Sequence, residues 1–128
     1  MRQGVKIVIG AVLVVLLLLA ALLIFMVVKQ GGEVKQLPFG TIDISQVADG
    51  IYHGSAKTTL VAAGVEVVAK DGALQSIRIT HHQNGLGKAA ESITDMMVHK
   101  NTLDVDAVSG ATVSSKVIQS AVYQALMK

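Results

Sequence analysis

The stretch "VAAGVEVVAKDGALQSIRIT", residues 61–80, decides the fold that the sequence predicts. Apolar side chains recur at every second residue on both sides of Asp71-Gly72, as they do in strands that bury one face. Glycine adopts the positive φ of the favoured hairpin turns, so this pair is a strong turn signal. The alternating positions are Val65, Val67 and Ala69 with Glu66, Val68 and Lys70 before the turn, and Ile77 and Ile79 with Ser76, Arg78 and Thr80 after it. The stretch predicts a β-hairpin, and residues 51–60 are expected to form a short strand before it.

The residues after the hairpin change from strand to helix periodicity. Residues 88–100, "KAAESITDMMVHK", place their apolar side chains on one side, which suits an amphipathic helix that ends near Asn101. After an extended link over residues 102–108, an apolar stripe predicts a last helix from about Gly110 to Leu126. Strands followed by two such helices predict an α+β domain, in which the helices cover one face of a small antiparallel sheet.

An apolar segment precedes this domain. Residues 7–28, "IVIGAVLVVLLLLAALLIFMVV", contain no charged or polar side chain, and a helix needs about 20 such residues to cross a bilayer. The segment is longer than the apolar core of a cleaved signal peptide, and no A-x-A-like cleavage site follows it. The chain has no cysteine, which excludes a lipoprotein anchor. We therefore expect an uncleaved signal anchor that holds the chain in a lipid bilayer.

The sequence divides into four segments. Residues 1–6 form a short N-terminus, residues 7–28 the predicted transmembrane helix, and residues 47–128 the predicted domain. Between them, residues 29–46 contain two adjacent glycines and the only proline of the chain, a composition typical of a linker.

The charges beside the apolar segment predict its orientation. Arg2, Lys6 and the free amino group lie before it, whereas Lys29 and Lys35 after it are partly offset by Glu33. By the positive-inside rule, the N-terminus is expected in the cytoplasm. The chain is then a single-pass protein of the cytoplasmic (inner) membrane with an extracytoplasmic domain.

Composition argues against several functions. The net charge of +2, the lack of a Lys/Arg-rich run and an aromatic content of 3% argue against nucleic-acid binding. His81 and His82 are adjacent on a predicted strand and point to opposite faces, so they cannot easily bind one metal ion as a pair. With no cysteine and no H-x-x-x-H, a structural metal site is not expected. No acid–base or nucleophile set for a substrate reaction stands out, so a stand-alone enzyme is not predicted.

Small residues mark the start of the last helix. In "SGAT", residues 109–112, a helix N-terminus with free N–H groups could bind an anion such as phosphate. Gly110 would let a ligand approach the backbone, and Lys116 could add charge one turn later. The alternative is that Ser109 only caps the helix, and the residues by themselves leave both interpretations open.

Three segments resemble the FMN-binding domain family. Residues 106–112 resemble its flavinylation motif, Asp-x-x-Ser/Thr-Gly-Ala-Thr. Residues 48–56, "ADGIYHGSA", are similar to its opening Asp-Gly-x-Tyr-x-Gly, and residues 81–93 to its His-x-x-Gly-x-Gly segment. The order and spacing hold over about residues 47–127. The family includes the C-type subunit of the sodium-pumping NADH:quinone reductase, the G-type subunit of the Rnf complex, and small membrane-anchored domains, which this chain resembles most.

The resemblance implies a covalent cofactor. FMN would be joined by a phosphoester to the hydroxyl of Thr112. A flavin transferase outside the cytoplasm would catalyse this reaction, using FAD and a divalent metal. Other residues would present the threonine and hold the phosphate, or lie near the isoalloxazine ring. The first group is Asp106, Ser109, Gly110, Ala111 and Ser115, and the second is His82, Gly85, Leu86 and Gly87. The larger subunits have an acidic-Thr-Pro sequence where this chain has His82-Gln83-Asn84.

The function implied is electron transfer. A membrane-anchored flavoprotein of this kind would relay electrons between a membrane or surface donor and another extracytoplasmic carrier, and the cofactor would supply the redox chemistry. Two alternatives remain at this point. The same helix end could hold FMN or a nucleotide phosphate reversibly without a redox role, or the domain could be a structural module with no ligand.

Overall fold

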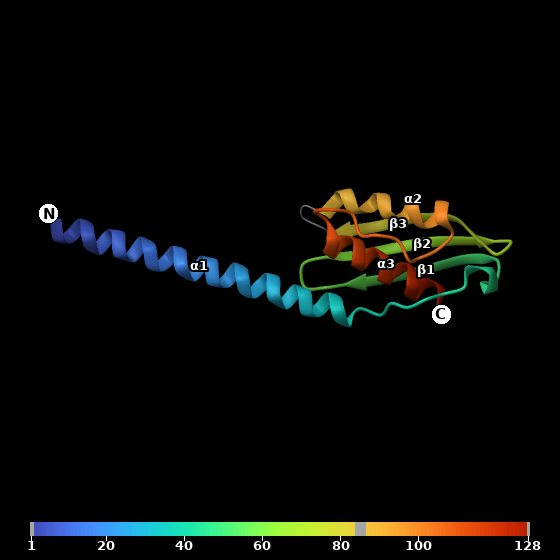
Figure 1. Cartoon of the computed structure of the whole chain (residues 1–128), viewed down its shortest axis with the longest axis horizontal. Helices are drawn as coiled ribbons and strands as arrows, with labels where there is room; N and C mark the ends of the chain where they lie inside the picture. Colours follow the sequence, from blue (N-terminus) through green and yellow to red (C-terminus); the bar gives the residue numbers. More distant parts are fainter. Residues whose placement is uncertain (1, 84–86, 128) are drawn as a thin grey trace.

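The computed structural model describes residues 2–83 and 87–127. A long N-terminal helix, α1 (Arg2–Gln36), leads to a three-stranded antiparallel sheet in the order β1-β2-β3, and two helices pack on the sheet (Figure 1). The predicted α+β architecture is confirmed. The other elements are a 3-10 helix η1 (Ile44–Gln46), β1 (Gly50–Lys57), β2 (Ala62–Lys70), β3 (Ala73–Gln83), a 3-10 helix η2 (Gly87–Ser92), α2 (Ile93–Lys100) and α3 (Thr112–Leu126).

The predicted hairpin is formed by β2 and β3. Val65 pairs with Ile79 and Val67 pairs with Ile77, so one face of the hairpin carries matched apolar side chains. Val65 and Val67 are fully buried, and their burial places the core on the face that the helices cover. The turn at residues 71–72 has positive φ at both positions, as a two-residue hairpin turn of the I′ kind requires.

The first strand is shorter than predicted. β1 ends at Lys57, and the next residues form a turn closed by a 2.7 Å bond from the Thr58 N–H to the Val61 carbonyl oxygen. The Thr58 hydroxyl also accepts from the Val61 N–H at 3.2 Å. The β1–β2 turn, residues 58–61, is therefore held in one shape by its own first residue.

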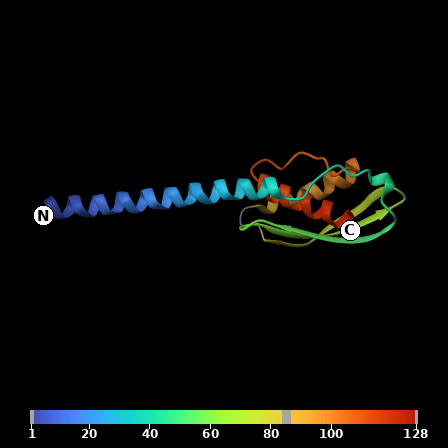
Figure 2. The same cartoon turned by 90° about the horizontal axis from the view of Figure 1, so that it is seen from below.

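Helix α1 is 35 residues long, and among the described residues it is the one helix long and apolar enough to span a membrane. None of its residues is buried, and most of the helix extends away from the domain (Figure 2). It also continues beyond Val28 through Gly31 and Gly32, so the predicted linker is helical up to Gln36. Glycine disfavours a helix by about 1 kcal/mol, but extending a helix that is already formed avoids the cost of nucleation.

The helix predicted over residues 88–100 is regular only in its second half. Residues 87–92 form η2, and α2 follows until Asn101. Asn101 has φ of 53°, and its N–H bonds to the carbonyl oxygens of Met97 and Val98, so the predicted helix end is confirmed. Its side-chain oxygen accepts from the Leu74 N–H at 2.8 Å, which fixes the end of α2 to β3.

Helix α3 lies against β1 and β2 at close range. A Cβ atom at Gly54 would lie 2.2 Å from the carbonyl oxygen of Ala121 and 2.5 Å from the backbone nitrogen of Ala125. Glycine is required there because the helix backbone touches the strand. Fully buried side chains at Val117 and Ile118 complete the contact, and the position of α3 fixes where its N-terminus is presented.

Candidate functional site

The candidate site is the segment that leads into α3. The Ala111 N–H donates to the Val108 carbonyl oxygen at 3.0 Å, which closes a turn with Ser109 and Gly110 at its centre. Gly110 has φ of +79° at the third position, where type II turns need glycine. A Cβ atom added to Gly110 would meet nothing within 4 Å. Backbone conformation therefore explains this glycine, and the space beside it is open.

Ser115 stabilises this turn through two hydrogen bonds of its hydroxyl. It is fully buried, and its hydroxyl accepts from the Val108 N–H at 2.9 Å and donates to the Ala111 carbonyl oxygen at 2.8 Å. The hydroxyl thus joins the first turn of α3 to both ends of the preceding turn. This supporting role was not predicted from the sequence, and a phosphate contact by Ser115 stays a prediction.

Thr112 is the first residue of α3, and it is exposed together with Ser109 and Gly110. The N-cap position belongs to Ala111, and no side chain caps this end of the helix among the described residues. The alternative in which Ser109 caps the helix is therefore wrong. The first N–H groups of a helix have no acceptor within it, and the helix dipole makes this end positive. The arrangement suits an anion beside an accessible hydroxyl.

Two charged residues flank the turn on the surface. Asp106 is exposed on the extended link, and Lys116 is exposed four residues after Thr112, on the same helix face.

The extended link is fixed by Gln119, whose side-chain nitrogen donates to the carbonyl oxygens of Leu103 at 3.2 Å and Val105 at 2.8 Å. The role of Gln119 was not predicted from the sequence. The available signal was a polar residue within the apolar stripe of α3.

The two adjacent histidines at the end of β3 occupy opposite faces, as predicted. His81 lies over Gly64 on the exposed face, where a Cβ atom at Gly64 would be 2.4 Å from its ring. The His82 side chain is only 3% exposed, and its Nδ1 lies 3.8 Å from a carboxylate oxygen of Glu91 in η2. Among the described residues, no group of three or more His, Cys, Asp or Glu side chains could hold a metal ion.

The structure describes only one of the other three residues that were predicted to lie near the isoalloxazine ring. Gly85 and Leu86 lie outside the described residues, and Gly87 begins η2. η2 packs against α3, and η2 and the N-terminus of α3 share one end of the domain. In both views this end faces α1 (Figures 1 and 2). The fold thus brings together parts of two of the three segments that resemble the family, although Gly87 and Thr112 are 25 positions apart.

Comparison with known proteins identifies the family of this domain. The model of the FMN-binding domain family matches residues 61–127, more than half of the chain. The matched range runs from the β1–β2 turn to the end of α3, and β1 extends the same sheet. The comparisons with curated proteins and with solved structures found no match. The chain therefore belongs to the FMN-binding domain family.

Proposed function

We propose that this protein is a membrane-anchored electron carrier with FMN attached by a phosphoester to the hydroxyl of Thr112. The observation that carries the proposal is the position of Thr112. It is an exposed hydroxyl on the first residue of an uncapped helix, inside the Asp-x-x-Ser-Gly-Ala-Thr sequence of a family member. Few positions in a folded domain combine an accessible hydroxyl with free N–H groups for a phosphate.

The residues around Thr112 fit a phosphate group. The space beside Gly110 is open, Thr112 two residues later is exposed, and the N-cap residue Ala111 makes no side-chain hydrogen bond to the helix N–H groups. Lys116 adds a positive charge on the same face of the helix. The new bond would join the Thr112 oxygen to the phosphorus of FMN, with AMP released from FAD by the transferase.

Bound FMN would supply the redox chemistry, and the chain would supply its placement. Ser115 and Gln119 hold the turn and the link in position through their backbone bonds. We assign a carrier role rather than a stand-alone enzyme because the motif provides a tether and its support. The partners in this proposal are the transferase and a membrane or extracytoplasmic redox protein.

The proposed location is supported by α1. Its apolar part, residues 7–28, would cross the cytoplasmic membrane once, with Arg2 and Lys6 on the cytoplasmic side. The domain would then lie outside the cytoplasm, where the flavin transferase of this family acts.

A second function rests on the same helix end. An uncapped helix N-terminus binds phosphate without a covalent bond, so FMN or another nucleotide could bind reversibly. In that case the ligand would leave on denaturation, and Thr112→Ala would keep much of the binding.

Intact mass measurement tests the covalent proposal. The full chain, co-expressed with a flavin transferase, should gain the mass of one FMN minus water and show in-gel flavin fluorescence. Thr112→Ala should lose both completely, because the attacking oxygen is gone. Thr80→Ala, which removes another exposed threonine hydroxyl on β3, is the matched control and should keep both. A chain that gains no mass would contradict the covalent attachment.

A further inference from the structure

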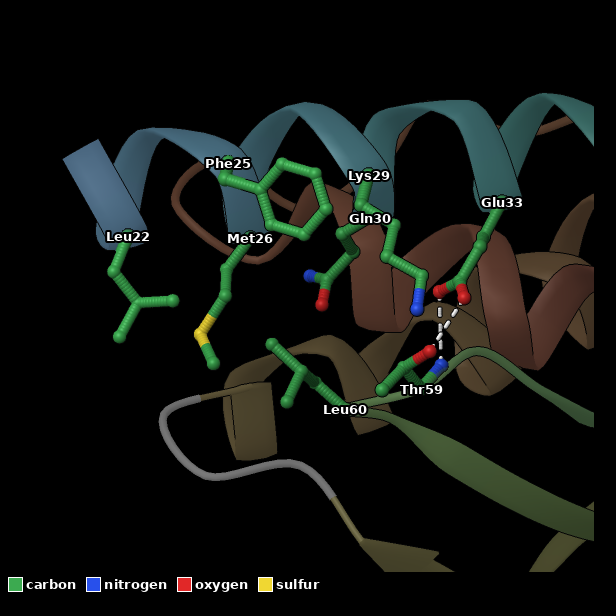
Figure 3. Close-up of a pocket in the computed structure, with 8 residues that line it drawn as sticks. All are labelled: Leu22, Phe25, Met26, Lys29, Gln30, Glu33, Thr59 and Leu60. Carbon is green, nitrogen blue, oxygen red and sulfur yellow. Dashed lines mark hydrogen bonds between the residues drawn. The ribbon is translucent and has the colours of Figure 1, made fainter.

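The β1–β2 turn forms an apolar surface together with α1. A cavity of about 120 Å³ separates the turn from the helix. Leu60 points from the turn toward the helix, and Leu22, Phe25 and Met26 line the cavity from α1 (Figure 3). These side chains remain exposed, at 50% for Leu60 and 64% for Phe25. Apolar side chains of two elements thus line one part of a space that this chain does not fill, and Lys29, Gln30, Glu33 and Thr59 line the rest.

Polar contacts hold the turn at this place on α1. One carboxylate oxygen of Glu33 accepts from the Thr59 N–H at 2.8 Å, and the other accepts from the Thr59 hydroxyl at 2.5 Å (Figure 3). The pair joins residues 26 positions apart, so it fixes the domain against the helix rather than stabilising either alone. We call this pair the Glu33–Thr59 clamp. Because the turn is also closed by Thr58, the clamp fixes the position of Leu60.

The cavity lies level with the apolar part of α1. Residues 7–28 extend for about 33 Å as a helix, close to the hydrocarbon thickness of about 30 Å. Met26 and Leu22 precede Val28 by two and six residues, which corresponds to about 3 and 9 Å along the axis. Leu60 lines the same cavity and therefore reaches the depth at which the apolar segment ends. Glu33 lies beyond that segment, at the depth of the lipid headgroups.

We propose that the β1–β2 turn is a second membrane contact, with Leu60 inserted among lipid acyl chains beside α1. The proposal rests on the membrane anchoring proposed above. Lipid is the occupant that the structure favours, because Leu22, Phe25 and Met26 at the cavity belong to the exposed apolar segment of α1. Lys29 beside the cavity and Lys57 before the turn add positive charge at headgroup depth, where anionic lipids attract it.

The absence of cysteine from the chain makes a direct test possible. Single variants Leu60→Cys, Leu13→Cys and Ile51→Cys would carry an environment-sensitive fluorophore in the full chain, reconstituted in nanodiscs that contain only this protein and lipid. Leu13 lies within the apolar segment, six residues after its start and well before Met26. Ile51 is the matched control, an apolar residue that is 63% exposed near the other end of β1. The labels at 60 and 13 should show blue-shifted emission and protection from aqueous iodide, whereas the label at 51 should show neither.

The clamp is tested in the same system. Glu33→Ala, and separately Thr59→Val, should shift the emission of the label at position 60 toward that at position 51, and the label at 13 should not change. No such shift with either variant would overturn the role of the clamp.

The outcomes separate this inference from the anchoring. A label that is shielded at 13 and quenched at 60 would overturn the turn as a membrane contact and leave α1 as an anchor. Quenching at both positions would overturn the anchoring and the inference together, while the mass test of Thr112 would stand. Shielding at 60 that requires an added extract of host membranes would assign the surface to a protein partner and overturn the lipid assignment.

Discussion

Two turns of this domain carry the same backbone feature in different surroundings. The β2–β3 turn, residues 71–72, and the turn at residues 109–110 each contain a glycine with positive φ, at +73° and +79°. Both were visible in the sequence as short glycine-containing breaks before a regular element. Only the second belongs to the candidate site, so a positive-φ glycine does not by itself indicate function.

The difference lies in what surrounds each glycine. A Cβ atom at Gly72 would lie 3.3 Å from the Cα of Ser45, and the Gly72 carbonyl oxygen accepts from the side chain of Asn101 at 3.3 Å. A Cβ atom at Gly110 would meet nothing within 4 Å, and exposed Thr112 follows it. The first turn is enclosed by its neighbours, and the second leaves space for a ligand. If this openness distinguishes the two turns, substitutions in them should affect FMN attachment differently.

The largest effect on stability is expected at Gly54 in β1, which is more crowded than either turn glycine. Gly54→Ala should lower the free energy of unfolding by about 1–3 kcal/mol, because α3 must move away from β1. Urea unfolding of the full chain in detergent, followed by tyrosine fluorescence, measures the change, since Tyr52 and Tyr123 are the only tyrosines and tryptophan is absent. Gly31→Ala, at an uncrowded position in α1, should cause no loss. Equal losses in both variants would contradict the crowding explanation.

The next effect concerns the support of the open turn. Ser115→Ala should lower the free energy of unfolding by about 1–2 kcal/mol, because the Val108 N–H loses its acceptor. It should also lower the fraction of chains that gain FMN. Ser120→Ala removes another buried hydroxyl, which donates to the Pro38 carbonyl oxygen away from the turn. A similar loss of stability without loss of FMN is expected there, and equal FMN loss in both would refute a specific role of Ser115.

The direct comparison is Gly72→Ala against Gly110→Ala. Each should cost about 1 kcal/mol of stability, because alanine is strained at positive φ. Gly110→Ala should also reduce FMN attachment measured by intact mass, whereas Gly72→Ala should not. If Gly72→Ala reduced attachment as much, the distinction between the enclosed and the open turn would fail.

The smallest effect is expected from the charge beside the open turn. Lys116→Gln should slow FMN attachment a few-fold at low ionic strength, and added salt should remove the difference because it screens exposed charges. A time course of the mass gain measures the rate. Lys100→Gln on α2 is the matched control, and its rate should equal that of the unchanged chain.

The sequence predicted those parts of the molecule that depend on local pattern. The hairpin follows from alternation around Asp71-Gly72, and the end of α2 follows from Asn101, which adopts a left-handed conformation. The start of α3 was placed two residues early, because a turn at Ser109-Gly110 resembles a helix beginning in sequence. The pattern could place Thr112 within the motif, but it could not show that the helix end is uncapped.

The remaining features depend on contacts between distant residues. The Glu33–Thr59 clamp joins residues 26 positions apart, and Gly54 is glycine because of a helix that follows more than 50 residues later. The continuation of α1 through Gly31 was missed because local composition favoured a break, whereas the preceding long helix favoured extension. No single stretch of sequence contains this information.

The end of the domain that presents Thr112 is also the end that faces α1 (Figures 1 and 2). With the clamp in place, this end cannot rotate freely on a flexible tether. A flavin attached there would stay near the bilayer surface, and a donor confined to the membrane would reach it by lateral diffusion in two dimensions. A soluble acceptor would have to approach from the side. The orientation of one helix would therefore determine which class of partner meets the cofactor most often.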